Sequence, residues 1–234
     1  MFLAAARGIA EALFGGRCYL CRGTAHGGLL CAGCDGDLPR LPAERCPRCA
    51  LPSTGGRACG RCLAQDPAYD ATEAALSFAF PADVLVHALK YRGELALAPL
   101  LASMLAPRIA RDDRIAAVVP VPLSAARLRE RGFNQAMEIA RPLAATAGAP
   151  LQPGWLERTT DTPALAGLAL ADRARSVRGA FRCTAAVAGL SVVVVDDVMT
   201  SGATLDEVAR TLKHAGAARV VNWVVARTLP HADA

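Results

Sequence analysis

The sequence contains no run of about 18 uncharged apolar residues, which excludes an ordinary transmembrane helix. Its N-terminal stretch, Phe2–Phe14, carries Arg7 and Glu11 and lacks both a continuous apolar core and a cleavage site. We interpret this stretch as a short amphipathic helix rather than a signal peptide. The expectation is a cytoplasmic protein with no membrane insertion.

Lysine is also scarce. It occurs only at Lys90 and Lys213, so the net charge of +5 comes almost wholly from arginine. This charge permits polyanionic ligands without requiring nucleic acid. With 53% apolar and 20% charged residues, the chain of 234 residues is expected to form one or two globular domains rather than to stay disordered.

The most informative segment is Val192–Thr204. Four consecutive valines, Val192–Val195, are typical of a strand buried on both faces of a parallel sheet. Two adjacent carboxylates, Asp196 and Asp197, follow at the C-terminal end of this strand, where they are costly unless they bind something. The alternative is an ordinary strand, turn and helix with Asp197 near the helix N-terminus.

A small, hydroxyl-rich turn follows the acid pair and leads into a helix expected to begin near Thr204. Backbone N–H groups and hydroxyls at such a helix start can bind a phosphate, and a glycine lets the backbone approach it closely. The candidate phosphate-binding residues are Thr200, Ser201, Gly202, Ala203 and Thr204. The segment is no Walker loop, because no Gly-Lys-Thr follows, and it lacks G-x-G-x-x-G.

This segment resembles the phosphoribosyl-pyrophosphate (PRPP) loop of type I phosphoribosyltransferases. The resemblance implies that Asp196 and Asp197 contact the ribose 2′ and 3′ hydroxyls. It also implies that residues 200–204 surround the 5′-phosphate and that Mg²⁺ accompanies PRPP as a cofactor.

Eight of the nine cysteines form four C-x-x-C pairs near the N-terminus, and the first four recur at one constant interval. Two such pairs can complete a tetrahedral zinc site, so we predict two structural zinc sites. The metal-ligand candidates are Cys18, Cys21, Cys31, Cys34, Cys46, Cys49, Cys59 and Cys62. Grouping the first four and the last four is the simpler assignment, and an interleaved grouping stays open.

A disulfide framework and an iron–sulfur cluster are the alternatives for these cysteines. Paired C-x-x-C spacing without a secretion signal argues against disulfides, and iron–sulfur proteins use other spacings. The remaining Cys183 is interpreted as a small structural residue. The basic ribbon has Tyr19 as its only aromatic, so it is either a DNA-contacting surface or a solvated scaffold.

After a boundary at Asp66-Pro67, the chain alternates between strand and helix patterns. The expected strands are 74–80, 115–119, 190–195 and 220–226, and the expected helices are 82–91, 95–109, one ending near 147, and 204–215. This alternation predicts an α/β, doubly wound, mostly parallel sheet over 67–234, with an N-terminal helix and double zinc-ribbon domain over 1–66. Ligands bind such sheets at the C-terminal strand ends.

Pro120-Val121-Pro122 precedes the string Arg-Glu-Arg-Gly-Phe-Asn-Gln-Ala at 129–136. Together with the cysteine repeat and the PRPP-like loop, these motifs resemble the ComF family of ComFC- and GntX-like proteins. That family combines a double zinc ribbon with a type I phosphoribosyltransferase domain. The resemblance covers 18–227, nearly the whole chain.

The resemblance implies further site residues. Lys90 would be available for a phosphate, Arg129 and Arg131 would approach the pyrophosphate, and Arg175 would belong to a loop over 158–178 that closes on the site. Relatives often carry Gln and Asn where this chain has Leu165 and Ser176, so a polar contact of that loop is missing here.

Two functions follow from the resemblance, and the sequence leaves both open. In one, the protein binds PRPP or a related nucleotide and acts in DNA uptake during natural transformation, with single-stranded DNA and the competence machinery as partners. In the other, it is an active phosphoribosyltransferase that displaces pyrophosphate from PRPP. A non-catalytic zinc-ribbon adaptor is a third reading, against which the acid pair argues.

Overall fold

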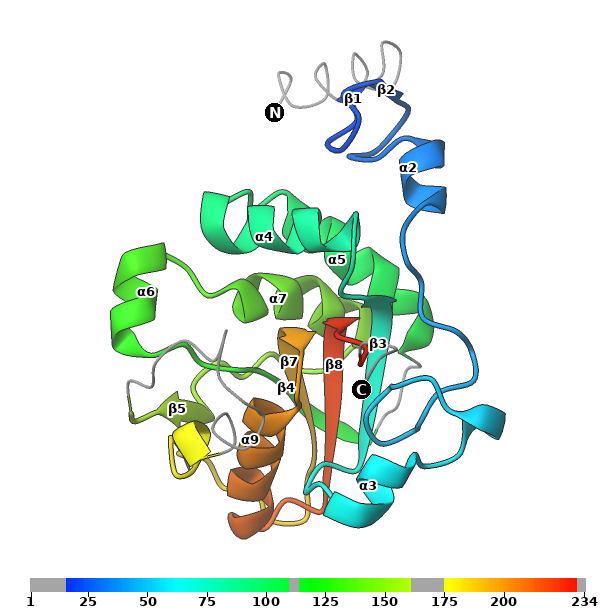
Figure 1. Ribbon diagram of the computed structural model, residues 1–234. Coiled ribbons are helices and arrows are strands. Elements are labelled where there is room, and N and C mark those ends of the chain that lie inside the picture. The colour runs from blue at the N-terminus through cyan, green and yellow to red at the C-terminus, as the bar shows by residue number, and fades with distance from the viewer. Residues whose placement is uncertain (1–15, 110–113, 161–174, 231–234) are drawn as a thin grey trace.

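The computed structural model describes residues 16–109, 114–160 and 175–230. Its centre is a four-stranded sheet in the order β3-β8-β7-β4, and every neighbouring pair is parallel (Figure 1). The strands are β3 (Ala71–Ser77), β4 (Ile115–Pro120), β7 (Ser191–Met199) and β8 (Arg219–Arg227). The predicted parallel α/β sheet is therefore confirmed.

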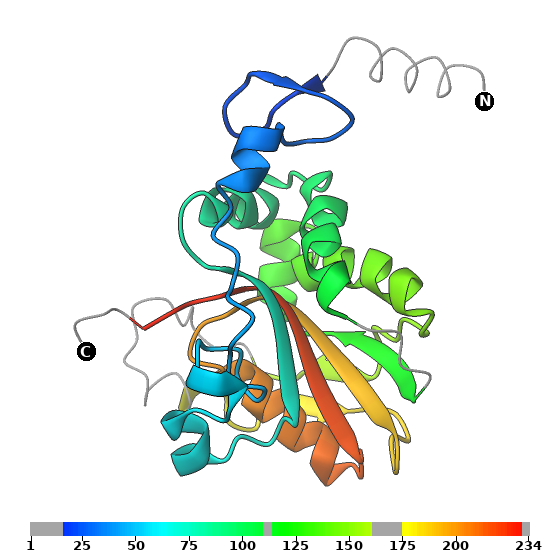
Figure 2. The same cartoon turned by 90° about the vertical axis from the view of Figure 1, so that its right-hand side faces the viewer.

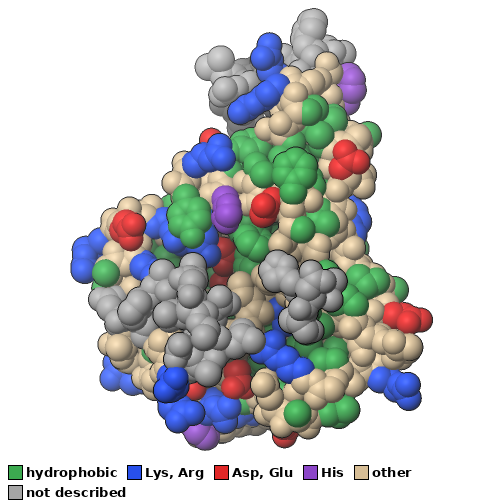
Figure 3. Space-filling view, in the orientation of Figure 1, with side chains coloured by type: hydrophobic (Ala, Val, Ile, Leu, Met, Phe, Trp, Pro, Cys, Tyr) green, Lys and Arg blue, Asp and Glu red, His purple; other side chains and the backbone are tan. Residues whose placement is uncertain are grey.

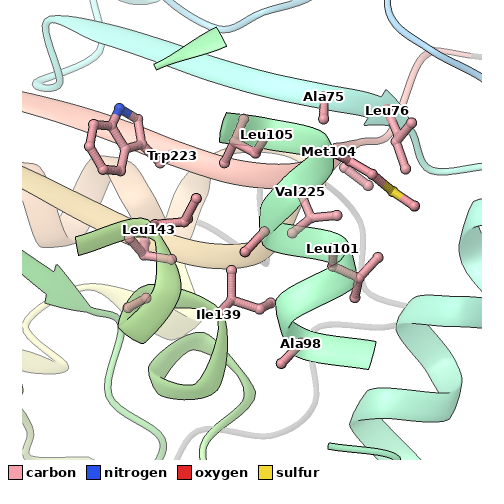
Figure 4. Close-up of a cluster of buried hydrophobic side chains, with 14 of the residues drawn as sticks. Ala75, Leu76, Ala98, Leu101, Met104, Leu105, Ile139, Leu143, Trp223 and Val225 are labelled. Carbon is pink, nitrogen blue, oxygen red and sulfur yellow. The ribbon is translucent and has the colours of Figure 1, made fainter. Parts of the chain in front are cut away.

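Helices cover both faces of this sheet. One face carries α4 (Ala82–Arg92), α5 (Leu97–Leu105), a 3₁₀ turn (Ala106–Arg108) and α7 (Gln135–Ala147), and the other carries α9 (Ala203–His214). Figure 4 shows Leu101, Ile139 and Leu143 from α5 and α7 pointing toward Trp223 and Val225 of β8. All five side chains are almost completely buried, as expected for the core of a doubly wound fold.

The valines of β7 divide between the two faces. Val193 and Val195 pack with the α4, α5 and α7 side, whereas Val192 and Val194 pack with the α9 side. The alternation follows from the two-residue period of a strand, and continuing it directs Asp197 toward the α4 side. The strand runs on past the valines to Met199 and pairs with β8 throughout, so the acid pair lies within β7 rather than after it.

The two cysteine clusters lie apart along the chain. The first contains the antiparallel pair β1 (Gly16–Arg17) and β2 (Thr24–Ala25) followed by α2 (Ala32–Gly36), and the second contains a 3₁₀ turn (Thr54–Gly56) and α3 (Gly60–Gln65). In Figures 1 and 2 the first cluster lies beyond α4, while the second lies beside the sheet. The linker between them runs along the edge strand β3, where Leu41 N–H donates to Ala75 O (3.1 Å) and Ser77 N–H donates to Pro39 O (2.7 Å).

Some elements differ from the sequence predictions or were not anticipated. The first strand begins at Ala71 and ends at Ser77 instead of spanning 74–80. The basic segment forms α6 (Ala125–Arg131), and β5 (Leu156–Arg158) pairs antiparallel with β6 (Phe181–Cys183). The expected N-terminal helix and positions 161–174 of the expected closing loop, Leu165 included, lie outside the described residues. Among the described helices, none has both the length and the apolar character needed to cross a bilayer.

Candidate functional site

Eight thiols form two tetrads in the order of the sequence. The first tetrad contains Cys18, Cys21, Cys31 and Cys34, and the second contains Cys46, Cys49, Cys59 and Cys62. Within each tetrad the Sγ atoms all lie within 4.8 Å of one another. The structure thus selects the sequential grouping over the interleaved one.

The geometry of both tetrads fits zinc. A tetrahedral site with Zn–S bonds of about 2.3 Å places its sulfur atoms about 3.8 Å apart. The Sγ atoms of Cys21 and Cys31 are 3.7 Å apart, and those of Cys49 and Cys59 are 3.6 Å apart. Backbone N–H groups also reach the sulfurs, as in the contact from Cys59 N–H to Cys46 Sγ at 3.3 Å.

The first thiol of each tetrad has a lowered pKa. Burial raises the pKa of the Cys18 thiol, but hydrogen bonds from the backbone of Cys21 and Cys31 outweigh burial and lower it to about 6. The same balance lowers the pKa of Cys46 to about 7. In the same tetrads the pKa of Cys34 is raised, chiefly by the neighbouring Cys21 thiol, and that of Cys62 is raised chiefly by burial. Thiolates are the form that binds metal, so Cys18 and Cys46 are the thiols most ready to bind a cation.

The two carboxylates of β7 have different surroundings. Asp197 is 3% exposed and points into the interior, whereas Asp196 is only partly buried. The backbone N–H of Asp197 donates to Asp196 Oδ1 at 2.9 Å. Burial and the neighbouring Asp197 carboxylate raise the pKa of Asp196 well above its usual value.

Lys90, at the end of α4, is the counter-ion of the acid pair. Its Nζ forms an ion pair with Asp197 Oδ2 at 3.2 Å. Burial opposes the charge of Asp197, but the Lys90 ammonium outweighs burial and lowers the pKa of Asp197. The two carboxylates likewise raise the pKa of Lys90 against the effect of its burial.

The turn after β7 has the features of an anion-binding helix start. Gly202 adopts φ = 85°, a left-handed conformation that glycine adopts readily, and it caps the N-terminus of α9. Ser201 Oγ accepts a hydrogen bond from Ala203 N–H at 3.3 Å. Thr200 is exposed and Thr204 partly buried, so both hydroxyls lie near the surface at the helix start.

The sequence did not reveal the role of Arg227, which binds backbone carbonyl groups of this turn. Arg227, at the end of β8, is 1% exposed and donates from Nη1 to the carbonyls of Met199 and Thr200. Its Nε donates to Cys49 O at 2.8 Å, which joins the turn to the second tetrad. At the end of a buried valine-rich strand, an arginine gives no sequence signal of such a role.

A cavity of about 560 Å³ lies between the second tetrad and this turn. Its lining includes Arg61 and Tyr69 from one side and Ser201, Gly202 and Asp206 from the other. The Asp206 carboxylate accepts a hydrogen bond from Ala68 N–H at 2.7 Å, which fixes the start of α9 against the chain that follows the ribbon.

The structure also describes the three arginines that the family resemblance predicted. The Arg131 guanidinium lies 5.4 Å from the centre of the Tyr91 ring, and Lys90 Nζ lies 6.0 Å from the same centre. Arg131 also donates to Gln135 Oε1. Arg129 is exposed on α6. Arg175 is exposed, and its backbone carbonyl accepts a hydrogen bond from Arg178 N–H. The structure therefore brings Lys90 to the acid pair and Arg131 to the neighbourhood of Lys90.

Comparisons with known proteins agree with this architecture. A family model described as a double zinc ribbon domain matches residues 9–63, and one described as a phosphoribosyl transferase domain matches residues 98–229. DNA utilization protein YhgH of Salmonella typhimurium is 34% identical over 224 residues, which cover 92% of this chain and 98% of that protein. Competence protein F of Haemophilus influenzae is 29% identical over 226 residues, with the same coverage of 92% and 98%.

Among solved structures, the glutamine PRPP amidotransferase from B. subtilis, complexed with ADP and GMP, is 26% identical with a TM-score of 0.37. The match covers 55% of this chain and 26% of that chain, so the protein spans about a quarter of its length. The two matching family models and the near full-length relatives establish the relationship without it. The chain belongs to the ComF family, in which a double zinc ribbon is joined to a phosphoribosyl transferase domain.

Proposed function

We propose that this protein binds PRPP, or a closely related ribose 5-phosphate ligand, together with Mg²⁺ at the edge of the sheet formed by the end of β7 and the start of α9. The observation that carries the proposal is the position of Asp196, a residue that is only partly buried, shortly before the turn of Thr200–Thr204. A carboxylate accepts hydrogen bonds from ribose hydroxyls, and free N–H groups at a helix start bind phosphate.

The two carboxylates take different parts in this proposal. Asp196 faces the ligand. Asp197 holds Lys90 near the ligand and compensates the charge of Lys90 when no anion is bound. Lys90 would then be shared between Asp197 and the pyrophosphate. Lys90 and Arg131 both lie within 6.0 Å of the centre of the Tyr91 ring, so Arg131 would add positive charge to this region.

If the protein turns over, the reaction is displacement of pyrophosphate from ribose C1 by a nitrogen nucleophile. Mg²⁺ would be held by the ligand oxygens and the carboxylates, and the positive charge of Arg129, Arg131 and Arg175 would stabilise the leaving group. The two zinc sites, in the proposed unit 1–66, would be structural. The phosphoribosyltransferase-like unit would span 67–234.

Isothermal titration with PRPP and Mg²⁺ tests the binding proposal. Asp196→Asn should weaken PRPP binding by about tenfold or more, the effect of losing one charged hydrogen-bond acceptor. Asp37→Asn, at an exposed carboxylate of the first ribbon, is the matched control and should bind as the wild type does. Equal affinity in the wild type and the Asp196 variant would defeat the proposal.

A second function, contact with single-stranded DNA, is favoured by a row of aromatic rings formed by Phe78, which follows β3, and two residues of α4. The Phe78 and His87 rings are 5.6 Å apart, and His87 and Tyr91 are also 5.6 Å apart. Tyr91 is 69% exposed, with the Arg131 guanidinium over its ring. Figure 3 shows hydrophobic, histidine and basic side chains side by side on this face.

Stacking rings interleaved with cations are the surface that single strands bind, and the names of the two relatives refer to DNA utilization and competence. The measurement is the fluorescence anisotropy of a labelled oligothymidylate. Tyr91→Ala should weaken its binding about fivefold or more, whereas Tyr19→Ala in the first ribbon should not. The opposite pattern would move DNA contact to the ribbon.

A further inference from the structure

Two arginines hold three consecutive carbonyl groups of the turn after β7. Arg227 donates to the carbonyls of Met199 and Thr200, and Arg61 Nη2 donates to the carbonyl of Ser201. These contacts join residues that are far apart in sequence, 140 positions in the case of Arg61 and Ser201.

Fixing those carbonyls also fixes the N–H groups that follow them. In a trans peptide the C=O and the next N–H point in opposite directions. With the carbonyls of residues 199–201 held against the arginines, the N–H groups of Thr200, Ser201 and Gly202 face away from them. None of these three N–H groups donates to another described residue. They form a set of donors without a described protein partner, as an anion-binding backbone turn requires.

Both arginines are linked to the second tetrad. Arg61 lies on α3 between Cys59 and Cys62, and Arg227 also donates to Cys49 O. The side chains of Cys46, Cys49 and Cys62 share a buried cluster with Leu205 and Val208 of α9. Within the described residues, the first tetrad has no contact of this kind with the turn.

We propose that Arg61 and Arg227 are positioning residues for the phosphate-binding turn, and that the second cysteine tetrad is a structural part of that turn while the first is not. The inference rests on the proposed function, because it assigns the purpose of the turn to phosphate binding. The two zinc sites then differ in their effect on the ligand: disruption of the second lowers PRPP affinity, and disruption of the first does not.

The main test replaces Arg61, which is partly exposed and therefore tolerates substitution better than Arg227. Arg61→Met should weaken PRPP binding about 10- to 100-fold, the loss expected of one hydrogen bond from a charged donor. Arg61→Lys should restore part of that affinity. Arg57→Met removes the same charge from an exposed position of the same ribbon and should bind PRPP as the wild type does.

The second arm compares equivalent cysteines of the repeat. Cys31 and Cys59 each precede the first residue of a short helix, α2 and α3. Cys59→Ser should reduce PRPP affinity about tenfold or more, whereas Cys31→Ser should leave the affinity within about twofold of the wild type. The loss of one charged hydrogen bond is large enough to produce this difference. Equal losses in both variants, or no loss in Cys59→Ser and Arg61→Met, would overturn the inference.

Hydrogen–deuterium exchange of the peptide over 199–205 gives a readout without any ligand. Exchange should rise in Arg61→Met and Cys59→Ser and stay unchanged in Arg57→Met and Cys31→Ser. If the wild type fails to bind PRPP but exchange follows this pattern, the positioning role stands and the proposed ligand is wrong. Unchanged exchange in Arg61→Met would show that the arginine does not hold the turn.

Discussion

Lys90 Nζ lies 3.2 Å from Asp197 Oδ2 and so joins the end of α4 to the C-terminal part of β7, an inner strand of the sheet. The lysine side chain is 26% exposed and the carboxylate 4%, which makes this one of the more deeply buried ion pairs of the described residues. A buried pair of this kind is costly to break, because removal of one partner leaves the other charge without compensation.

Lys90→Met should therefore lower the free energy of unfolding by about 2–4 kcal/mol, measured by urea denaturation. Lys213→Met is the matched control, since Lys213 pairs with Asp70 at 2.7 Å on a more exposed surface. It should cost about 1 kcal/mol or less. The double variant Lys90→Met with Asp197→Leu should recover part of the loss. Equal costs for the two lysines would contradict the role given to Lys90.

Acidification should reduce the difference in stability between the wild type and Lys90→Met. In the wild type the pKa of Asp197 is lowered, so the pair stabilises the fold above the unfolded-state pKa of about 4 and loses this effect as the pH falls through the folded-state pKa. In the variant, the orphaned carboxyl takes up a proton at a higher pH. Urea unfolding from pH 7 to pH 3 should show the difference shrinking steadily. A difference that grows on acidification would refute the pairing.

Much of the fold could be predicted from periodicity and spacing. The valine run, the strand–helix alternation and the C-x-x-C repeat are local signals, and the parallel sheet and the two cysteine clusters confirmed them. The predicted end of this strand, at residue 195, was wrong. Pairing with β8 extends the strand to Met199, although two aspartates interrupt its apolar run.

The contacts around the candidate site could not be predicted in the same way. Arg227 and Cys49 are 178 positions apart, and no pattern in the sequence connects them. Lys90 was predicted as a phosphate ligand from its family motif, whereas its pairing with Asp197 depends on how α4 packs over β7. Tertiary packing, rather than local propensity, decides both.

Gly202→Ala should destabilise the protein more than Gly148→Ala. Both glycines have positive φ, 85° and 69°, which costs an alanine about 1–2 kcal/mol. A Cβ at Gly202 would also lie 2.7 Å from Met199 Cε and 3.3 Å from the Tyr69 hydroxyl, whereas one at Gly148 meets nothing within 4 Å. Thermal unfolding should show the larger loss for Gly202→Ala, which alone should also weaken PRPP binding. Equal losses would contradict the tight packing of the turn.

Zinc should leave the two tetrads at different rates. Cys21 of the first tetrad is exposed, while Cys46, Cys49 and Cys62 of the second are buried. A colorimetric chelator should therefore release zinc in two phases of one ion each. Cys21→Ser should abolish the faster phase and keep the slower one. A single phase, or loss of the slower phase in this variant, would contradict the assignment.

The structure of the protein with PRPP and Mg²⁺ tests the central claim most directly. The account predicts ribose hydroxyls within hydrogen-bonding distance of the Asp196 carboxylate. It also predicts the 5′-phosphate on the N–H groups of the turn between β7 and α9, on the side opposite Arg61 and Arg227. A ligand bound elsewhere, with Asp196 making no contact to it, would contradict the account.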